Sequence, residues 1–169
     1  MILLDLPAQV QDVFREFRTC ELSTLARDGT PISWPTLPFY RPASGVFLIT
    51  TSIALPQKVF NIRRNPRVSM LFSDLTGSGL VDPPAVLVQG DAIAPDEILT
   101  SIDGFEKEVR MAIRRQPSGA IYSSNPLMRY YFDWYFMRLL ITVTPKRILW
   151  WERADFSVAP VCLEVDHVA

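Results

Sequence analysis

The stretch CELSTLARDGTPISWPTLPFY, residues 20–40, carries the strongest fold signal in this sequence. Its two halves are rich in apolar and hydroxyl residues, and the Asp-Gly pair at 28–29 tolerates the positive φ of a tight hairpin turn. The pattern predicts two antiparallel strands around that turn. Pro35 and Pro38 lie in the second strand, and proline has no N–H to donate to a neighbouring strand. We therefore expect this strand to be an edge, to be bulged, or to face something other than a strand.

The rest of the sequence alternates short strand-like and helical segments. In order, we expect an amphipathic helix ending near Phe17, strands at 20–27, 31–40 and 45–50, a helix at 55–64, strands at 67–72 and 85–93, helices at about 96–115 and 126–136, and a closing hairpin of 139–144 and 147–151. Many short strands joined by hairpin turns are typical of a closed or nearly closed antiparallel barrel. The predicted fold is therefore mainly β, a Greek-key-like antiparallel barrel in one domain, residues 1–169, with a helical insertion at about 96–136.

Composition narrows the class of protein. The formal net charge of −1, from 17 basic and 18 acidic residues, argues against general nucleic-acid binding. Cys20 and Cys162 are the two cysteines, and their wide separation gives neither a metal spacing nor a disulfide framework. Charged residues interrupt the most apolar tract, 127–144, so no membrane span is expected. With no secretory signal at the start of the sequence, these features predict a cytoplasmic protein.

The segment TTSIALPQK, residues 50–58, indicates chemistry. A buried strand ends in three hydroxyl residues, Pro56 opens a helix, and Lys58 lies in its first turn. Unpaired N–H groups at a helix start suit an anion, hydroxyls donate to phosphate oxygens, and lysine adds a point charge. The local charge is positive because three arginines follow, Arg63, Arg64 and Arg67. The segment predicts a monophosphate clamp, although an ordinary capped helix with Lys58 on a solvated face explains the same pattern.

Five segments in a fixed order resemble a known family. They are LSTLARDGTP at 22–31, GVFLIT at 45–50, KVFNIRRNPRVS at 58–69, QGDA at 89–92 and VTPKRILWW at 143–151. No single segment is specific, but their order and spacing resemble the pyridoxamine 5′-phosphate oxidase-like family of FMN-binding split β-barrels. The resemblance covers roughly two thirds of the chain.

The resemblance implies where a flavin binds. Thr50, Thr51 and Lys58 would hold its phosphate and ribityl chain. The polar edge of the isoalloxazine ring would meet the backbone of one strand, at Ser33, Trp34, Pro35 and Thr36. The family places this site between the two subunits of a homodimer, so contacts from the partner's side are expected at Gln89, Arg147, Trp150 and Trp151. For the tryptophans, packing in the core or at the dimer interface is the competing expectation.

The sequence departs from the family at its end. It lacks the arginine-histidine-arginine type signature that true pyridoxamine phosphate oxidases use for pyridoxal phosphate, and its one histidine, His167, is expected in a solvated tail. No acid/base constellation or metal cluster stands out, so the catalytic residues stay unassigned.

Three functions follow from the resemblance. The first is an FMN-dependent oxidoreductase that moves a hydride to or from a small organic substrate, since the cofactor carries the difficult step. The second is a reductase that uses the deazaflavin coenzyme, whose longer acidic tail needs extra cations such as the arginines at 63, 64 and 67. The third is a non-catalytic flavin or haem-binding protein. An aromatic cluster at 122–136 belongs either to a substrate pocket or, more commonly, to core and interface packing.

Overall fold

The computed structural model describes residues 6–100, 104–115 and 137–165. The predicted helix at 126–136, the aromatic cluster at 122–136 and His167 lie outside these residues. The helices are α1 (Ala8–Glu16), α2 (Gln57–Arg64), α3 (Glu106–Arg115) and the short 3-10 helix η3 (Glu152–Ala154). The strands are β1 (Cys20–Leu25), β2 (Pro31–Thr36), β3 (Pro38–Arg41), β4 (Val46–Ser52), β5 (Arg67–Phe72), β6 (Ala85–Ile93), β7 (Ile98–Leu99), β8 (Arg138–Trp151) and β9 (Val161–Glu164).

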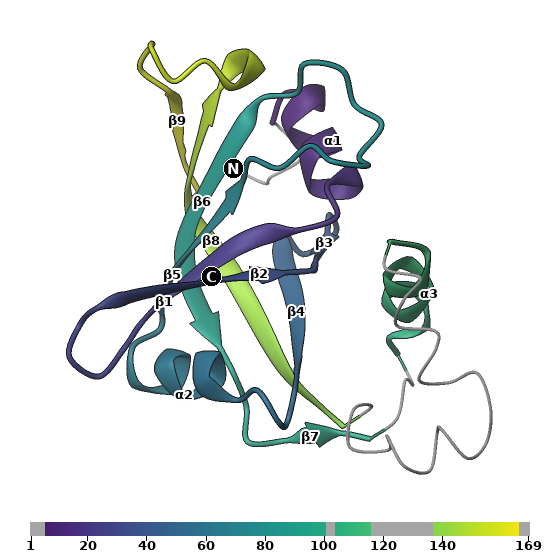
Figure 1. Cartoon of the computed structure of the whole chain (residues 1–169), viewed down its shortest axis with the longest axis vertical. Helices are drawn as coiled ribbons and strands as arrows, with labels where there is room; N and C mark the ends of the chain where they lie inside the picture. Colours follow the sequence, from purple (N-terminus) through teal and green to yellow (C-terminus); the bar gives the residue numbers. More distant parts are fainter. Residues whose placement is uncertain (1–5, 101–103, 116–136, 166–169) are drawn as a thin grey trace.

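The strands form one antiparallel sheet that curls on itself (Figure 1). Its order is β2-β1-β5-β6-β8-β4-β3, with β7 and β9 both paired to β8. The two strands at the ends of this order, β2 and β3, are consecutive in the chain and separated only by Leu37. The sheet therefore bends back on itself and leaves a seam along β2, which confirms the predicted split β-barrel. Helices α1 and α2 lie at opposite ends of the curled sheet (Figure 1).

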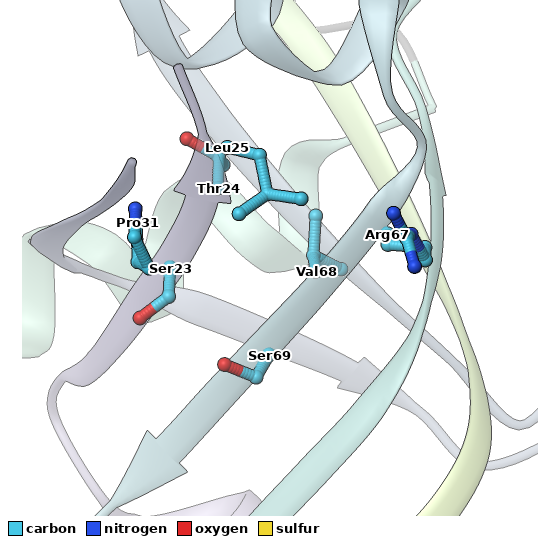
Figure 2. Close-up of a pocket in the computed structure, with 7 residues that line it drawn as sticks. All are labelled: Ser23, Thr24, Leu25, Pro31, Arg67, Val68 and Ser69. Carbon is cyan, nitrogen blue, oxygen red and sulfur yellow. The ribbon is translucent and has the colours of Figure 1, made fainter. Parts of the chain in front are cut away.

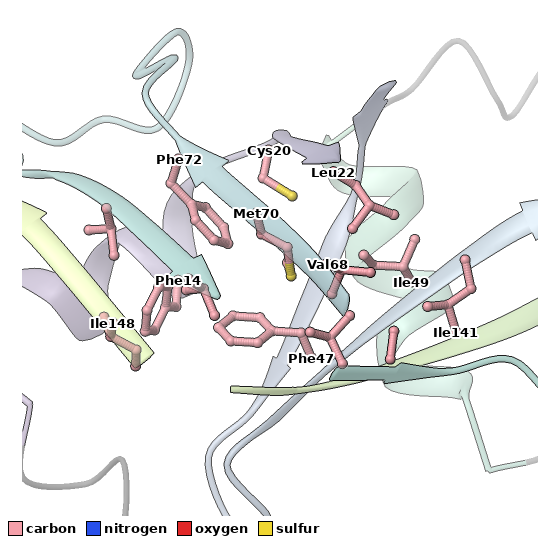
Figure 3. Close-up of a cluster of buried hydrophobic side chains, with 14 of the residues drawn as sticks. Phe14, Cys20, Leu22, Phe47, Ile49, Val68, Met70, Phe72, Ile141 and Ile148 are labelled. Atoms are coloured by element: carbon pink, nitrogen blue, oxygen red, sulfur yellow. The ribbon is translucent and has the colours of Figure 1, made fainter. Parts of the chain in front are cut away.

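Alternation along the strands builds the core. Leu22, Phe47, Met70 and Ile141 each expose none of their surface and point from different strands into the space that the sheet encloses (Figure 3). Phe14 enters from α1 and meets the ring of Phe47 edge-on, with the centroids 4.9 Å apart. Aromatic pairs of this geometry add stabilisation beyond the area they bury. The amphipathic helix predicted from the N-terminal apolar spacing is thus confirmed as α1, and the structure shows that it packs across one end of the barrel.

The single strand predicted at 31–40 is two strands. The segment bends at Leu37, so that β2 pairs with β1 while β3 pairs with β4. Both are end strands of the sheet order, which confirms the edge position expected from Pro35 and Pro38. Prolines at these positions remove N–H groups that no neighbouring strand requires.

The predicted closing hairpin at 139–151 is wrong. Residues 138–151 form one continuous strand, β8, because Pro145 lies in a bulge rather than in a turn. The register with β6 shifts between Gln89 and Gly90, which leaves Lys146 as the extra residue. On the other edge of β8, pairing with β4 ends at Val143 and pairing with β9 begins at Arg147. Pro145 thus lies where the partner strand changes and a ladder N–H is not needed.

The helix predicted at 96–115 begins later than expected. Residues 98–99 form β7, and α3 begins only at Glu106. Gly104 has a φ of +78°, a left-handed conformation that a continuous helix does not contain. The strand β9 near the C-terminus was not predicted. No helix within the described ranges has both the length and the apolar character needed to cross a bilayer.

Candidate functional site

Helix α2 places Lys58 in the interior of the protein. Val59 and Ile62 are almost completely buried and hold the helix against the barrel. Lys58 lies in the first turn beside them and exposes only 8% of its surface. The residue before the helix, Pro56, is its N-cap, and no side chain caps the first turn. The alternative interpretation of this segment was a helix capped by a side chain, with Lys58 on its solvated face. The structure contradicts both parts, because no side chain caps the helix and Lys58 is buried.

The ammonium group of Lys58 has only uncharged partners among the described residues. Its Nζ donates to Thr51 Oγ1 at 3.0 Å and lies 5.6 Å from the ring centroid of Trp34. No carboxylate in the described part of the chain forms an ion pair with it. Burial lowers the pKa of Lys58, and the nearby positive charge of Arg138 lowers it further. A bound anion would relieve both costs.

The two threonines expected at one phosphate point to opposite faces of β4. Successive residues of a strand alternate, and Thr51 is buried with Lys58 while Thr50 is only partly buried on the other face. Thr50 Oγ1 instead accepts from Arg138, with Nη2 at 3.3 Å and Nε at 3.4 Å. In the sequence, Arg138 is one of the charged residues that interrupt the apolar tract 127–144, and it was not predicted as a site residue. A charged residue at the start of an apolar strand was the signal that could have marked it.

The four residues predicted along the flavin ring divide between the faces of β2. Trp34 and Thr36 pair with core residues of β1 and point inward, whereas Ser33 and Pro35 are exposed. The Thr36 hydroxyl donates to the carbonyl oxygen of Cys20 at 3.3 Å. Burial raises the pKa of Cys20 to about 12, so its thiol stays protonated and is unsuited to nucleophilic chemistry. Trp34 is thus the member of this set that the structure brings to Lys58.

Of the residues predicted for the partner's side, Gln89, Arg147 and Trp151 lie on the outer face of the sheet, away from Lys58, whereas Trp150 points into the core. Gln89 of β6 is directly opposite Arg147 of β8. They belong to a row of polar residues in register across the sheet, Ser33, Ser23, Ser69, Gln89, Arg147 and Glu164. Arg147 pairs with Glu164 at 3.0 Å and donates to the sulfur of Cys162 at 3.2 Å. Further along β8, Trp151 packs on Phe156, while Trp150 is buried.

An open cavity of about 320 Å³ lies beside this row (Figure 2). It forms where the pairing of β1 with β5 ends, beyond Ser23 and Ser69. Its lining consists of Ser23, Thr24, Leu25, Pro31, Arg67, Val68 and Ser69. The cavity does not include Lys58 or Trp34. Within the described residues, no group of three or more metal-ligating side chains is present.

The arginines that follow Lys58 have partners of their own. Arg63 donates to the carbonyl oxygens of Ala94 and Pro95 and pairs with Asp96 at 2.5 Å. The guanidinium of Arg64 donates to Asn61 Oδ1 at 2.6 Å, and that of Arg67 contacts Asn65 Oδ1 at 3.4 Å. These three arginines are close to Lys58 in the sequence, but they bond to other groups and do not form a cluster of cations around it.

These features place the protein in a structural class, the split β-barrels. Within the barrel, a buried lysine without a carboxylate partner in the described structure lies at the start of a helix that no side chain caps. The family model for pyridoxamine 5′-phosphate oxidase matches residues 6–152, and the chain belongs to that family. No curated protein matches the chain in sequence.

Solved structures share the fold at low sequence identity. General stress protein 26 from Bacillus anthracis is 19% identical with a TM-score of 0.56, over 93% of this chain and 96% of its own. An F420 reductase is 22% identical with a TM-score of 0.56, over 85% and 98%. A heme binding protein from Mycobacterium smegmatis is 16% identical with a TM-score of 0.53, over 94% and 59%. These likenesses establish the architecture and not the ligand.

Proposed function

We propose that this chain is a flavin-binding oxidoreductase that holds the phosphate of FMN at Lys58 and moves a hydride to or from a small organic substrate. The observation that carries the proposal is that Lys58 exposes only 8% of its surface and has no carboxylate partner in the described structure. Lys58 belongs to the first turn of α2, whose N–H groups have no side-chain cap. A terminal phosphate satisfies both groups together. When bound, FMN supplies the hydride chemistry, and the chain supplies binding and orientation.

The seam along β2 suits the flat part of the cofactor. Strand β2 pairs with β1 on one edge, and no strand among the described residues pairs with its other edge. We infer that the backbone groups at Ser33–Thr36 would bond the polar edge of an isoalloxazine ring, which the free edge of β2 and the family resemblance both support. Pro35 removes one N–H from this set. Trp34 would connect the proposed isoalloxazine site to the proposed phosphate site, since Lys58 Nζ lies 5.6 Å from the centroid of the indole ring.

The placement of the arginines favours FMN over the deazaflavin coenzyme. The acidic tail of the deazaflavin needs cations beyond the phosphate, and Arg63 is bound to carbonyl oxygens and to Asp96 instead. Arg64 is held by Asn61. The likeness to an F420 reductase keeps the deazaflavin as the second candidate. The likeness to a heme binding protein keeps a non-catalytic binding role as the third candidate.

The outer face of the sheet is the proposed contact with a second copy of the chain. Leu71, Leu87 and Leu149 are in register there and only half-buried. They adjoin the polar row that contains Gln89 and Arg147. An apolar centre bordered by polar residues is typical of protein interfaces. In this arrangement Gln89, Arg147 and Trp151 would lie in the interface between the two subunits, and the protein is expected to act in the cytoplasm as a homodimer.

Cofactor titration tests the proposal. We expect the purified protein to bind FMN in preference to riboflavin and to the deazaflavin, with one FMN for each chain in a particle of two chains. Visible absorbance and equilibrium binding measure the first, and sedimentation measures the second. Preference for the deazaflavin would select the second candidate. A protein that binds none of the three would contradict the proposed site, and bound FMN that no nicotinamide cofactor reduces would favour the non-catalytic role.

The affinity for FMN should fall as the pH rises, and the fall should begin at a lower pH than it would for a lysine with the ordinary pKa. Phosphate binding requires protonated Lys58, whose pKa in the free protein is lowered from the ordinary lysine value of 10.5 by burial and by the nearby charge of Arg138. Affinity is therefore constant below that lowered pKa and decreases as the pH rises through it. The phosphate itself is already a dianion above a pH of about 6. Riboflavin serves as the control, and an FMN affinity independent of pH up to 10.5 would argue against contact with Lys58.

A further inference from the structure

Helix α2 has a polar side chain where its buried face should be apolar. Asn61 lies three residues after Lys58 and exposes none of its surface. Burying an amide costs free energy unless its donors and acceptors find partners. Asn61 finds three. Its Nδ2 donates to Thr24 Oγ1 at 2.9 Å, and its Oδ1 accepts from Gln57 Nε2 at 3.1 Å and from Arg64 Nη2 at 2.6 Å.

These three bonds connect the helix to the barrel at a specific position. Gln57 is the first residue of α2 and Arg64 its last, while Thr24 belongs to β1 and is 1% exposed. Apolar packing at this position would also bury surface, but it would tolerate small rotations and shifts of the helix. A satisfied buried polar network has one good geometry and so fixes the helix in place.

We propose that Asn61 is the positioning residue of the anion site, because its hydrogen bonds to Thr24 and Gln57 hold the start of α2 on β1 so that Lys58 and the first-turn N–H groups point at the same oxygen atoms. The inference rests on the proposed function, since it concerns how the same site is held. Asn61 does not itself touch the phosphate. Its removal therefore affects binding of the phosphate group and leaves the contacts of the ring unchanged.

The experiment compares FMN with riboflavin, which lacks the phosphate. In Asn61→Leu we expect FMN affinity to fall about tenfold or more, as when one charge-assisted hydrogen bond is lost, and riboflavin affinity to stay the same. Thr24→Val should lower the FMN-to-riboflavin ratio in the same direction, whereas Thr24→Ser, which retains the hydroxyl, should keep it. The Thr24 pair guards against a folding defect in Asn61→Leu, because it changes the network from the β1 side.

Inorganic phosphate separates this inference from the proposed function. Amide NMR signals of the first turn of α2 should shift on phosphate addition in the wild type and in Thr24→Ser, and not in Asn61→Leu. A wild type that binds phosphate but not FMN would contradict the flavin proposal and leave the positioning role standing. The role is overturned if folded Asn61→Leu keeps the wild-type phosphate response, if it loses FMN and riboflavin affinity equally, or if the wild type shows no phosphate response.

Discussion

Lys58→Met is expected to weaken FMN binding about a hundredfold and to stabilise the cofactor-free protein by about 1 kcal/mol. The two effects have one cause. Lys58 is buried, its pKa is lowered, and its partners are a hydroxyl group and an indole ring. At pH values below the lowered pKa the folded chain bears the full cost of keeping this group charged, and that cost falls to zero as the pH rises from the lowered pKa to the pKa of the unfolded chain. Methionine removes the cost and fills similar space.

Equilibrium titration and thermal unfolding measure the two effects. Lys107→Met is a matched control, because Lys107 is exposed on α3 and its replacement should change neither quantity. Riboflavin affinity should be nearly unaffected in both variants. A Lys58→Met protein that binds FMN as tightly as the wild type would mean that the phosphate lies elsewhere. A variant that loses both FMN affinity and stability would show that Lys58 holds the fold rather than a ligand.

Gly90→Ala is expected to destabilise the protein by more than about 4 kcal/mol, enough to prevent folding in a domain of ordinary stability. A methyl group on Gly90 would overlap the carbonyl oxygen of Thr144 and lie 2.9 Å from its carbonyl carbon and 3.0 Å from Cα of Pro145. All of these atoms are backbone. The β8 backbone that carries them is held on both sides of this point, because β8 pairs with β6 from Thr142 to Trp151 and, on its other edge, with β4 up to Val143 and with β9 from Arg147.

Thermal unfolding and soluble yield test this expectation. Gly29→Ala is the comparison, since Gly29 has a φ of +86° but nothing within 4 Å of an added methyl group. It should cost only the strain of a left-handed alanine, about 1 kcal/mol. The contrast separates steric overlap from backbone conformation. Equal and small effects at both positions would mean that the bulge opposite Pro145 can relax, and that β8 is less constrained than its pairing indicates.

Local signals predicted most of the fold, and contacts distant in sequence account for the errors. The Asp-Gly turn, the apolar run of β4 and the helical period of α2 each depend on neighbouring residues. The continuity of β8 depends instead on Gly90, which is 55 positions from Pro145 and makes room for the bulge. A proline followed by a lysine indicates a turn when only neighbouring residues are considered, because the sequence does not show that Gly90 lies opposite Pro145.

The candidate site was predicted in part for the same reason. Lys58 and Thr51 lie within one local segment, and the structure brings them into contact. Arg138 reaches Thr50 from a strand 88 residues away, and Asn61 reaches Thr24 across 37 residues. A strand's alternation also separates Thr50 from Thr51, which spacing along the chain could not show without knowing which face is buried. Polar residues in apolar patterns, Arg138 and Asn61, were the available signals.

The change of partner along β8 has a mechanical consequence. On one edge, β8 pairs with β6 and, at Arg138 and Leu139, with β7, whereas on the other edge its first half pairs with β4 and its second half with β9. Pro145 interrupts that second edge, so the two flaps share no hydrogen-bonded boundary. Loss of the hydrogen bonds between β9 and β8 would therefore not propagate along this edge into β4, which carries Thr51 beside Lys58. Pro145 thus makes the two sets of hydrogen bonds on this edge of β8 independent of each other.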